Sequence, residues 1–393
     1  MPYYDPYDFD IDADPYPAWK RLRDEAPLYY NEKYEFYALS RYADVEPGLV
    51  DWQTYSSAKG SVLEFIKADV KMPPGIFIFE DPPEHNLYRG LLTGIFTQRR
   101  LAAIEPQVRA FAARTVEALA ENAEFDFIAD LAAHVPMRTI GMLLGIPEED
   151  QEAVRDQIDQ SLRLQEGAMP DAAAMASAHG VSDYGAYIDW RTDHPSDDVM
   201  TELLTAEFTD EHGTTRTLTR GEILSYIGLL SGAGNETTTR LIGWAGKLLA
   251  ELPDQRQQLV DDPALIPGAI EELLRYEPPS PVQARYVMRD VELHGRVVPA
   301  GSAMLLLNAS ANRDERQFPD PDRFDIRRKA QRHLSFGYGL HFCLGAHLAR
   351  LEARVTLEEL FKRFPTWEVD WDNAVQARTS TVRGWEKLPV RVR

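Results

Sequence analysis

The chain has 393 residues, enough to bury a large core, and it contains no low-complexity linker and no internal repeat. Its formal net charge of −21 argues against nucleic acid as a partner, and its single cysteine excludes an internal disulfide, a four-cysteine zinc site and an iron–sulfur cluster held by this chain. The polar, acidic N-terminus has no apolar run that would serve as a signal peptide or membrane anchor. We therefore expect one cytoplasmic domain over residues 1–393.

The first eighty residues predict short helices, a strand pair and an apolar loop. We expect helices over Tyr16–Glu25 and Arg41–Leu49, with a pair of strands between them over Leu28–Leu39. The segment Lys59–Phe79 is strongly apolar although glycines and prolines interrupt it. Two interpretations remain open for this segment: core packing beneath a long loop, or the roof of a ligand pocket that would include Ile78 and Phe79.

A helix start is predicted at Asp81-Pro-Pro-Glu, which combines an N-cap aspartate, proline in the first turn and an acid three residues later. The helix would carry His85 and Arg89 four residues apart on one face, an arrangement more typical of a solvated surface when taken alone. Two or three amphipathic helices should follow up to Gly145. Residues 147–215 are polar and helical apart from a stretch rich in methionine and alanine over 168–178.

A long apolar helix should begin at the capping box of Thr219 and Glu222 and run to Leu252, about 50 Å at 1.5 Å per residue. Glycines and β-branched hydroxyl residues weaken its middle, Ser231–Thr239. One interpretation is close helix–helix contact, with Glu236 satisfied structurally. The other is a local widening over a flat cofactor, with Glu236 and Thr237 placed for proton transfer.

Two further helices are expected within Asp254–Arg275, and the second carries Glu272 and Arg275 at a spacing of three residues. Pro278–Pro281 then forces an extended exit into a strand over Val282–Tyr286, followed by short strands up to Asn308.

The only cysteine, Cys343, stands between a glycine-containing loop and a helix predicted over Ala346–Phe364. Free amides and the helix dipole at such a position lower the pKa of a thiol, so we expect a thiolate here. A thiolate in this place would be a soft metal ligand or a nucleophile.

The loop sequence Phe336-Gly337-x-Gly339-x-His341-x-Cys343-x-Gly345 resembles the heme-binding loop of the cytochrome P-450 heme-thiolate monooxygenases. The resemblance spans about Asp81 to Gly384 and includes five motifs in the family's order. It implies a mainly α fold with a small β-rich lobe drawn mainly from residues 28–60, 282–310 and 366–393. Heme b, an iron protoporphyrin IX, would lie between the long helix and the helix after the Cys343 loop.

The resemblance also implies roles for individual residues. Cys343 would be the axial ligand of the heme iron. The propionates would be bound by His85, Arg89, Arg285 and His333, and further heme contacts would come from Phe336, Gly337 and Ala233. Thr237 would hold a water where dioxygen is activated, and Glu236 would relay protons inward. A structural lock would consist of Glu272, Arg275 and Arg323.

The implied activity is insertion of one oxygen atom from dioxygen into an organic substrate. Because no flavin or nicotinamide fingerprint is present, electrons should come from NAD(P)H through a ferredoxin reductase and a ferredoxin. The ferredoxin would dock near Cys343 on a basic island formed by Arg350 and Arg354, joined by Arg99, Arg100 and Arg332. The substrate should be a mostly apolar lipid, terpenoid, steroid-like or aromatic compound, with Arg383 or Gln283 available for a polar end such as a carboxylate. Its pocket would include Ile78, Phe79, Leu230, Val282 and Val382.

Three alternatives remain open. A heme-thiolate peroxygenase, or another enzyme of this fold that needs no external electrons, would often lack the Glu236–Thr237 pair. A heme sensor or carrier would not need that pair. A hydrolase with Cys343 as nucleophile and His341 as base would need an oxyanion arrangement that is not evident in the sequence.

Overall fold

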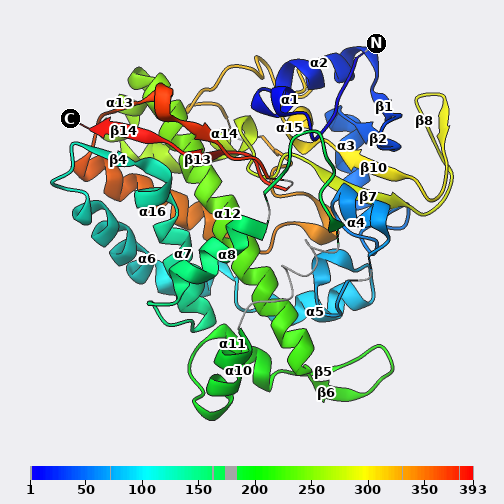
Figure 1. The fold of residues 1–393 in the computed structure, drawn as a ribbon, viewed down its shortest axis with the longest axis horizontal. Coiled ribbons are helices and arrows are strands. Elements are labelled where there is room, and N and C mark those ends of the chain that lie inside the picture. The colour runs from blue at the N-terminus through cyan, green and yellow to red at the C-terminus, as the bar shows by residue number, and fades with distance from the viewer. Residues whose placement is uncertain are drawn as a thin grey trace.

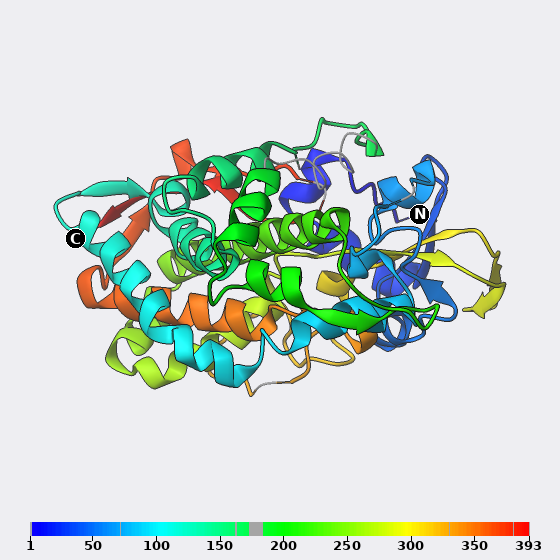
Figure 2. The same cartoon turned by 90° about the horizontal axis from the view of Figure 1, so that it is seen from below.

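The computed structural model describes residues 2–70, 72–161, 163–172, 184–329, 331–379 and 381–392. A single helix of 32 residues, α12 (Arg220–Glu251), crosses the middle of the molecule, as both views show (Figures 1 and 2). Its capping box forms as predicted, because the Thr219 hydroxyl accepts the Glu222 N–H while the Glu222 carboxylate accepts the Thr219 N–H. The weak middle of this helix does not break it.

Helices are the main regular structure, and the helices predicted before residue 147 and after residue 218 form within a few residues of their expected bounds. The prediction that residues 147–215 are helical is wrong in part, because 163–171 are not helical and two short strands form a hairpin within 207–217. The described helices other than α12 are α1 (Phe9–Ala13), α2 (Tyr16–Glu25), α3 (Tyr42–Val50), α4 (Leu63–Ala68), α5 (Glu84–Thr93), α6 (Gln98–Ala118), α7 (His134–Leu144), α8 (Gln151–Ser161), α10 (Tyr184–Asp193), α11 (Val199–Thr205), α13 (Pro253–Asp261), α14 (Ile266–Tyr276), α15 (Asn308–Ala311) and α16 (Ala346–Arg363). Single turns of other helix types are η1 (Phe77–Phe79), η2 (Phe127–Ala132), η3 (Pro263–Leu265), η4 (Gly339–His341) and η5 (Trp371–Asn373). Of the methionine- and alanine-rich stretch, residues 173–178 lie outside the described residues.

The main β lobe is a five-stranded sheet in the order β1-β2-β10-β7-β3, in which only the β2–β10 pair is parallel. It combines two of the three predicted ranges, through β1 (Leu28–Asn31), β2 (Phe36–Leu39), β3 (Tyr55–Ser56), β7 (Gln283–Val287) and β10 (Ala303–Leu306). The predicted fold class, mainly α with a small β part, is thus what the structure shows.

The third predicted range, 366–393, does not join this sheet. It forms separate sheets at the opposite end of the molecule, where β14 pairs with both β11 and β4 (Figure 1). The strand β4 (Glu124–Asp126) was not expected from the sequence. The remaining strands are β5 (Glu207–Thr209), β6 (Thr215–Thr217), β8 (Val291–Leu293), β9 (Arg296–Val298), β11 (Trp367–Val369), β12 (Val375–Gln376), β13 (Trp385–Lys387) and β14 (Pro389–Val392).

Two apolar clusters lie on the two halves of α12. Tyr226 and Leu230 belong to one cluster, and Trp244 and Leu248 belong to the other. One stretch, Phe127–Leu144, is long and apolar enough to cross a membrane, but most of it is buried inside the protein, where α7 packs against α12 and α6. We interpret this stretch as a core segment.

The helix start at Asp81 differs from the prediction. Asp81 does not cap α5, which begins at Glu84; its carboxylate accepts hydrogen bonds from the Ser56 hydroxyl and the Ser57 N–H instead. The acid therefore ties the start of α5 to the edge of the main sheet.

The predicted lock forms with one different member. Glu272 and Arg275 make a buried bidentate pair, with Arg275 Nε 2.7 Å from Glu272 Oε2 and Nη2 2.8 Å from Oε1. The third side chain is Arg328, whose Nε lies 3.0 Å from Glu272 Oε1. Arg323 is wrong as the third side chain, since its guanidinium is exposed and only its backbone carbonyl accepts from Arg275 and Arg328.

Removing the Glu272 charge should therefore destabilise the fold far more than removing the exposed Arg323 charge. We expect Glu272→Gln to lower the free energy of unfolding by about 3–5 kcal/mol, because the buried Arg275 and the partly buried Arg328 both lose their counter-ion. Arg323→Gln, the matched control, should change it by about 0.5 kcal/mol or less. Urea unfolding of both variants measures the difference, and equal losses would contradict the assignment of Arg328.

Candidate active site

The loop before α16 fixes Cys343 by a tight backbone turn. The Cys343 N–H donates to the Phe336 carbonyl at 2.8 Å, and Gly337 and Gly339 take φ values of +69° and +73°. A Cβ at Gly339 would lie 3.2 Å from Cα of Val50, so the loop also approaches the end of α3 closely. Glycine is therefore required at these two positions, because other residues rarely adopt a positive φ and a side chain at position 339 would crowd Val50.

The thiol itself does not behave as predicted from its place before a helix. The Cys343 side chain is accessible to solvent, yet the surrounding protein atoms raise the pKa of the thiol. The Gly345 N–H and the charges of Arg89 and Arg350 act in the opposite direction but do not prevail. The expectation of a lowered pKa is therefore wrong for the metal-free chain, whereas a bound metal ion deprotonates a coordinating thiol outright.

Four basic side chains from three elements gather close to this loop. His85 and Arg89 come from α5, Arg285 from β7 and His341 from η4, two residues before Cys343. The imidazole rings of His85 and His341 have centroids 4.5 Å apart, and Arg89 Nη2 donates to the Phe342 carbonyl at 2.6 Å. We call these four residues the basic cradle.

The basic cradle has no anion among the described residues. Arg89 and Arg285 form no ion pair there, and His85 Nε2 and both ring nitrogens of His341 are buried without a hydrogen-bond partner in that part of the chain. Burial lowers the pKa of Arg285 to about 10, only partly opposed by Asp81, and burial with the charges of Arg285, His85 and Arg89 lowers the pKa of His341 to about 2. Such a cluster is suited to a ligand that carries more than one negative charge.

His333, which we expected in this cluster, lies elsewhere. Its Nε2 is 3.2 Å from Glu271 on α14, and the same carboxylate pairs with Arg350 of α16. The structure instead brings His341 to the cradle, a residue considered above only as the base of a hydrolase. Its position two residues before the cysteine was the signal that could have identified it. His341 makes no hydrogen bond to Cys343 in the structure, so the geometry of a Cys–His hydrolase is not present.

The middle of α12 presents an accessible alanine and a threonine. Ala233 is exposed although it lies in the centre of a 32-residue helix in the core, and the Thr237 hydroxyl donates to its carbonyl at 2.9 Å. Gly234, by contrast, is a close helix contact, because a Cβ there would lie 3.0 Å from Ile140 Cδ1 of α7. The interpretation as a close helix–helix contact therefore holds for Gly234, whereas a widening over a flat cofactor stays a prediction.

Glu236, next to Thr237, is buried and faces a charged environment. Its carboxylate pairs with Arg240 at 2.8 Å, and Arg240 also donates to the Trp385 carbonyl. Glu236 lines a polar cavity with other side chains of α12 and with charged side chains of the surrounding segments: Asn235, Thr239, Arg240, Arg155, Arg163, Arg378 and Glu386. The Glu236 side chain thus lines the polar cavity that lies against α12.

The residues predicted for a substrate pocket separate into two places. Phe79 and Leu230 are buried in one apolar cluster, where the Phe79 and Phe65 rings are 5.5 Å apart, and Ile78 is half-buried against that cluster. Val282 and Val382 line a different cavity, beside the N-terminal segment. Phe79 and Leu230 are therefore core residues. Of the five residues predicted for the pocket, only Val282 and Val382 line this cavity.

A single accessible cysteine next to four basic groups, of which His85 and Arg285 are buried and Arg89 and His341 partly buried, fits one kind of ligand, a metal-bearing group with attached carboxylates. Heme meets this description, since Cys343 would ligate the iron while the basic cradle would neutralise the two propionates. Phe336, partly buried and under the guanidinium of Arg350 at 4.5 Å, and Gly337 belong to the same loop. The site defines a heme-thiolate protein.

Comparisons with known proteins agree with this class. A family model described as cytochrome P450 matches residues 257–383. The chain is 40% identical over 392 residues to putative cytochrome P450 123 of Mycobacterium tuberculosis, covering 99% of this chain and 96% of that protein. It is 36% identical over 386 residues to vitamin D(3) 25-hydroxylase of Pseudonocardia autotrophica, covering 96% and 93%.

Among solved structures, CYP109E1 from Bacillus megaterium in complex with testosterone is similar with a TM-score of 0.88 at 29% identity, covering 98% of this chain and 99% of that one. The chain therefore belongs to the cytochrome P450 family and is a P450 monooxygenase.

The basic cradle should determine how firmly heme is held. We expect Arg285→Gln and Arg89→Gln each to weaken heme binding by about 10-fold to 100-fold, the value of one charge-assisted hydrogen bond. The rate of heme transfer to excess apomyoglobin measures this without any turnover. Arg99→Gln is the control, because Arg99 is exposed and has no ion pair among the described residues. Unchanged transfer rates in both cradle variants would contradict the assignment.

Proposed function

We propose that this P450 inserts one oxygen atom into a mostly apolar small molecule, such as a lipid, terpenoid, steroid-like or aromatic compound, with electrons from a separate ferredoxin and its reductase. The observation that carries the proposal is the combination of an accessible Cys343 thiol, a cradle without an anion, and an acid–alcohol pair on the neighbouring long helix. When bound, heme supplies the activation of dioxygen and the oxidising power.

The residues of the chain would do the rest. Cys343 would ligate the iron as thiolate, and the basic cradle would orient the heme through its propionates. Ala233 has a small side chain at the accessible middle of α12, so a flat group can approach the helix closely. Thr237 would bind a water through its hydroxyl, which is positioned by the hydrogen bond to the Ala233 carbonyl.

Protons would reach Thr237 through Glu236. This carboxyl is buried, is held by Arg240 and lines the polar cavity, so it connects a place where water can enter with the residue that follows it in the helix. Rotation of the carboxylate away from Arg240 would carry a proton inward.

Ferredoxin remains our proposal for the electron donor, but the predicted basic island is largely neutralised. Arg350 pairs with Glu271, Arg354 with Glu105 and Glu358, Arg100 with Glu202 and Arg332 with Glu46. Of the five arginines, only Arg99 has no ion pair among the described residues, so an acidic carrier would contact chiefly that one. The single unpaired cysteine suits the reducing cytoplasm, where we place both proteins.

A peroxygenase or another electron-independent enzyme of the same fold is the second candidate. The buried Glu236 beside Thr237 favours the dioxygen-dependent reaction, since a proton route through a dry helix has no use when peroxide is supplied.

The ligand of the iron is tested by the reduced, carbon monoxide-bound spectrum. We expect a strongly red-shifted Soret band in the wild-type protein and its loss in Cys343→Ala and Cys343→His, together with the loss of oxygen insertion. A wild-type band typical of imidazole ligation, or a protein that stays colourless after heme supplementation, would refute thiolate ligation.

The role of Thr237 is tested by coupling. Thr237→Ala should bind substrate and accept electrons normally but release most of them as peroxide, because the positioned water is lost. Thr237→Ser, which keeps the hydroxyl, should remain largely coupled. The ratio of product formed to NAD(P)H consumed measures this, and full coupling in Thr237→Ala would remove Thr237 from the proposed role.

A further inference from the structure

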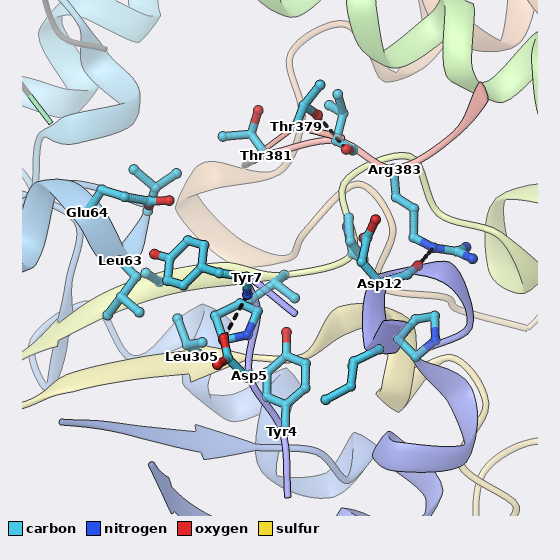
Figure 3. A pocket seen from close by; sticks show the side chains of 18 of the residues that line it. Tyr4, Asp5, Tyr7, Asp12, Leu63, Glu64, Leu305, Thr379, Thr381 and Arg383 are labelled. Atoms are coloured by element: carbon cyan, nitrogen blue, oxygen red, sulfur yellow. Dashed lines mark hydrogen bonds between the residues drawn. The ribbon is translucent and has the colours of Figure 1, made fainter. Parts of the chain in front are cut away.

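A second cavity lies beside β7, where Ala284 lines it, and Figure 3 shows other side chains of its walls. The empty space between its walls, counted together with the open solvent at its mouth, is about 730 Å³. Its walls come from the N-terminal segment and α2, the start of α4, the strands β7 and β10, and the loop before β13. Val282 and Val382, two of the predicted substrate residues, lie in these walls.

The charged groups of this cavity are mostly paired already. Asp5 pairs with Lys33 at 3.1 Å, and Asp12 pairs with Arg378 at 2.6 Å. Arg383 Nη1 is 2.6 Å from Glu277, and its other nitrogens donate to the carbonyls of Asp12 and Ala13. The sequence suggested that Arg383 could bind the carboxylate of a ligand. Because its guanidinium nitrogens already bind Glu277, Asp12 and Ala13, Arg383 is not available for that role.

Glu64 is the exception. This residue is 3% exposed and forms no ion pair with any described residue, although it lies in the cavity wall. The Tyr7 hydroxyl points toward it (Figure 3) and is itself buried without a hydrogen-bond partner of good geometry in the described part of the chain. Burial raises the pKa of the Glu64 carboxyl, and burial next to Glu64 raises the pKa of the Tyr7 hydroxyl.

The backbone N–H of Glu64 and the Tyr7 hydroxyl act on this carboxyl, but no cation of the described residues does, and a buried carboxylate without a cation is costly. The groups around it favour a cation, since the rings of Tyr4, Tyr7 and Trp19 line the same cavity and aromatic faces attract ammonium groups. The apolar side chains of Leu63, Val282 and Leu305 would accept an aliphatic or aromatic body.

We propose that this cavity is a binding subsite for an apolar small molecule with a positively charged amine, whose ammonium group pairs with Glu64 and contacts the Tyr7 hydroxyl. As a site of substrate selection it rests on the proposed monooxygenase function. The cavity lies against the strand that serves the heme site, because Ala284 lines the cavity and the next residue, Arg285, belongs to the basic cradle.

The test is calorimetric titration of the holoenzyme with three molecules that share one chain: octyltrimethylammonium, octanol and octanoate. The quaternary ammonium has no lone pair, so it does not ligate iron and reports only on the charge. We expect it to bind about 10-fold to 100-fold more tightly than the other two, as one charge-assisted contact contributes. Glu64→Gln should bring the ammonium affinity close to that of octanol and leave the octanol affinity unchanged.

Glu32→Gln is the matched control, since it removes one exposed acid with the same change in net charge and should preserve the preference. If Glu64→Gln does not fold, Val282→Phe fills the cavity and should weaken the binding of all three molecules. Equal affinities in the wild-type protein, a preference retained in Glu64→Gln, or unchanged binding in Val282→Phe would each overturn the proposal. The proposed function fails on a different measurement, the carbon monoxide spectrum, so the two failures are distinguishable.

Discussion

The structure depends on a cluster of basic side chains, two arginines and two histidines, that forms no ion pair with a carboxylate of the described residues. His85 and Arg89 on α5, Arg285 on β7 and His341 beside the cysteine loop lie together without a carboxylate. Buried charges without partners are unfavourable, so the folded chain tolerates this cluster only because packing elsewhere fixes the three elements. The Asp81 contacts to Ser56 and Ser57 hold α5 against the main sheet, and the Glu272–Arg275–Arg328 cluster holds the meander that leads into the cysteine loop. These supports hold the three elements of the cradle in place without an ion pair, which is the arrangement that a bound anionic group such as heme would complete.

The long helix α12 separates two kinds of environment at one turn. Thr237 and Ala233 are on its accessible side, whereas Glu236 is buried toward a polar cavity and Gly234 contacts α7. Consecutive residues of a helix are about 100° apart, so neighbouring positions such as 236 and 237 necessarily face different surroundings. An acid and an alcohol that are adjacent in sequence therefore face two different environments without any break in the helix, as the proposed proton transfer requires. Residues of this weak stretch have different contacts: Gly234 lies against α7, the Thr237 hydroxyl donates to the helix backbone, and Glu236 pairs with Arg240.

The sequence predicted the helices, the capping box of α12 and the cysteine loop, because local patterns determine these features. It failed where the partner came from a distant segment. His333 and His341 both flank the glycine loop, and only the position of Glu271 on α14 decides which of them is taken away from the cradle. Arg323 and Arg328 are similar basic residues in the same meander, and the backbone path alone places Arg328 on Glu272. The pKa of the Cys343 thiol is set by the protein atoms that surround it more than by the helix terminus, and local sequence does not show which of the two effects is larger.

The strand β7 separates two uncompensated charges of opposite sign. Among the described residues, Arg285 is a buried cation that forms no ion pair, although the charge of Asp81 acts on it, and Glu64, which lines the cavity with Ala284, is a buried acid that forms no ion pair. Successive residues of a strand point to opposite faces, so these two groups do not neutralise each other even though the chain places them close in the fold. A fold that needed only stability would pair them or replace both with apolar side chains. Their separation instead leaves one site for an anionic group and one for a cationic group on either side of the same strand, and in this family the anionic group is the heme. By the same physical argument, the group that completes Glu64 belongs to a molecule that the protein binds.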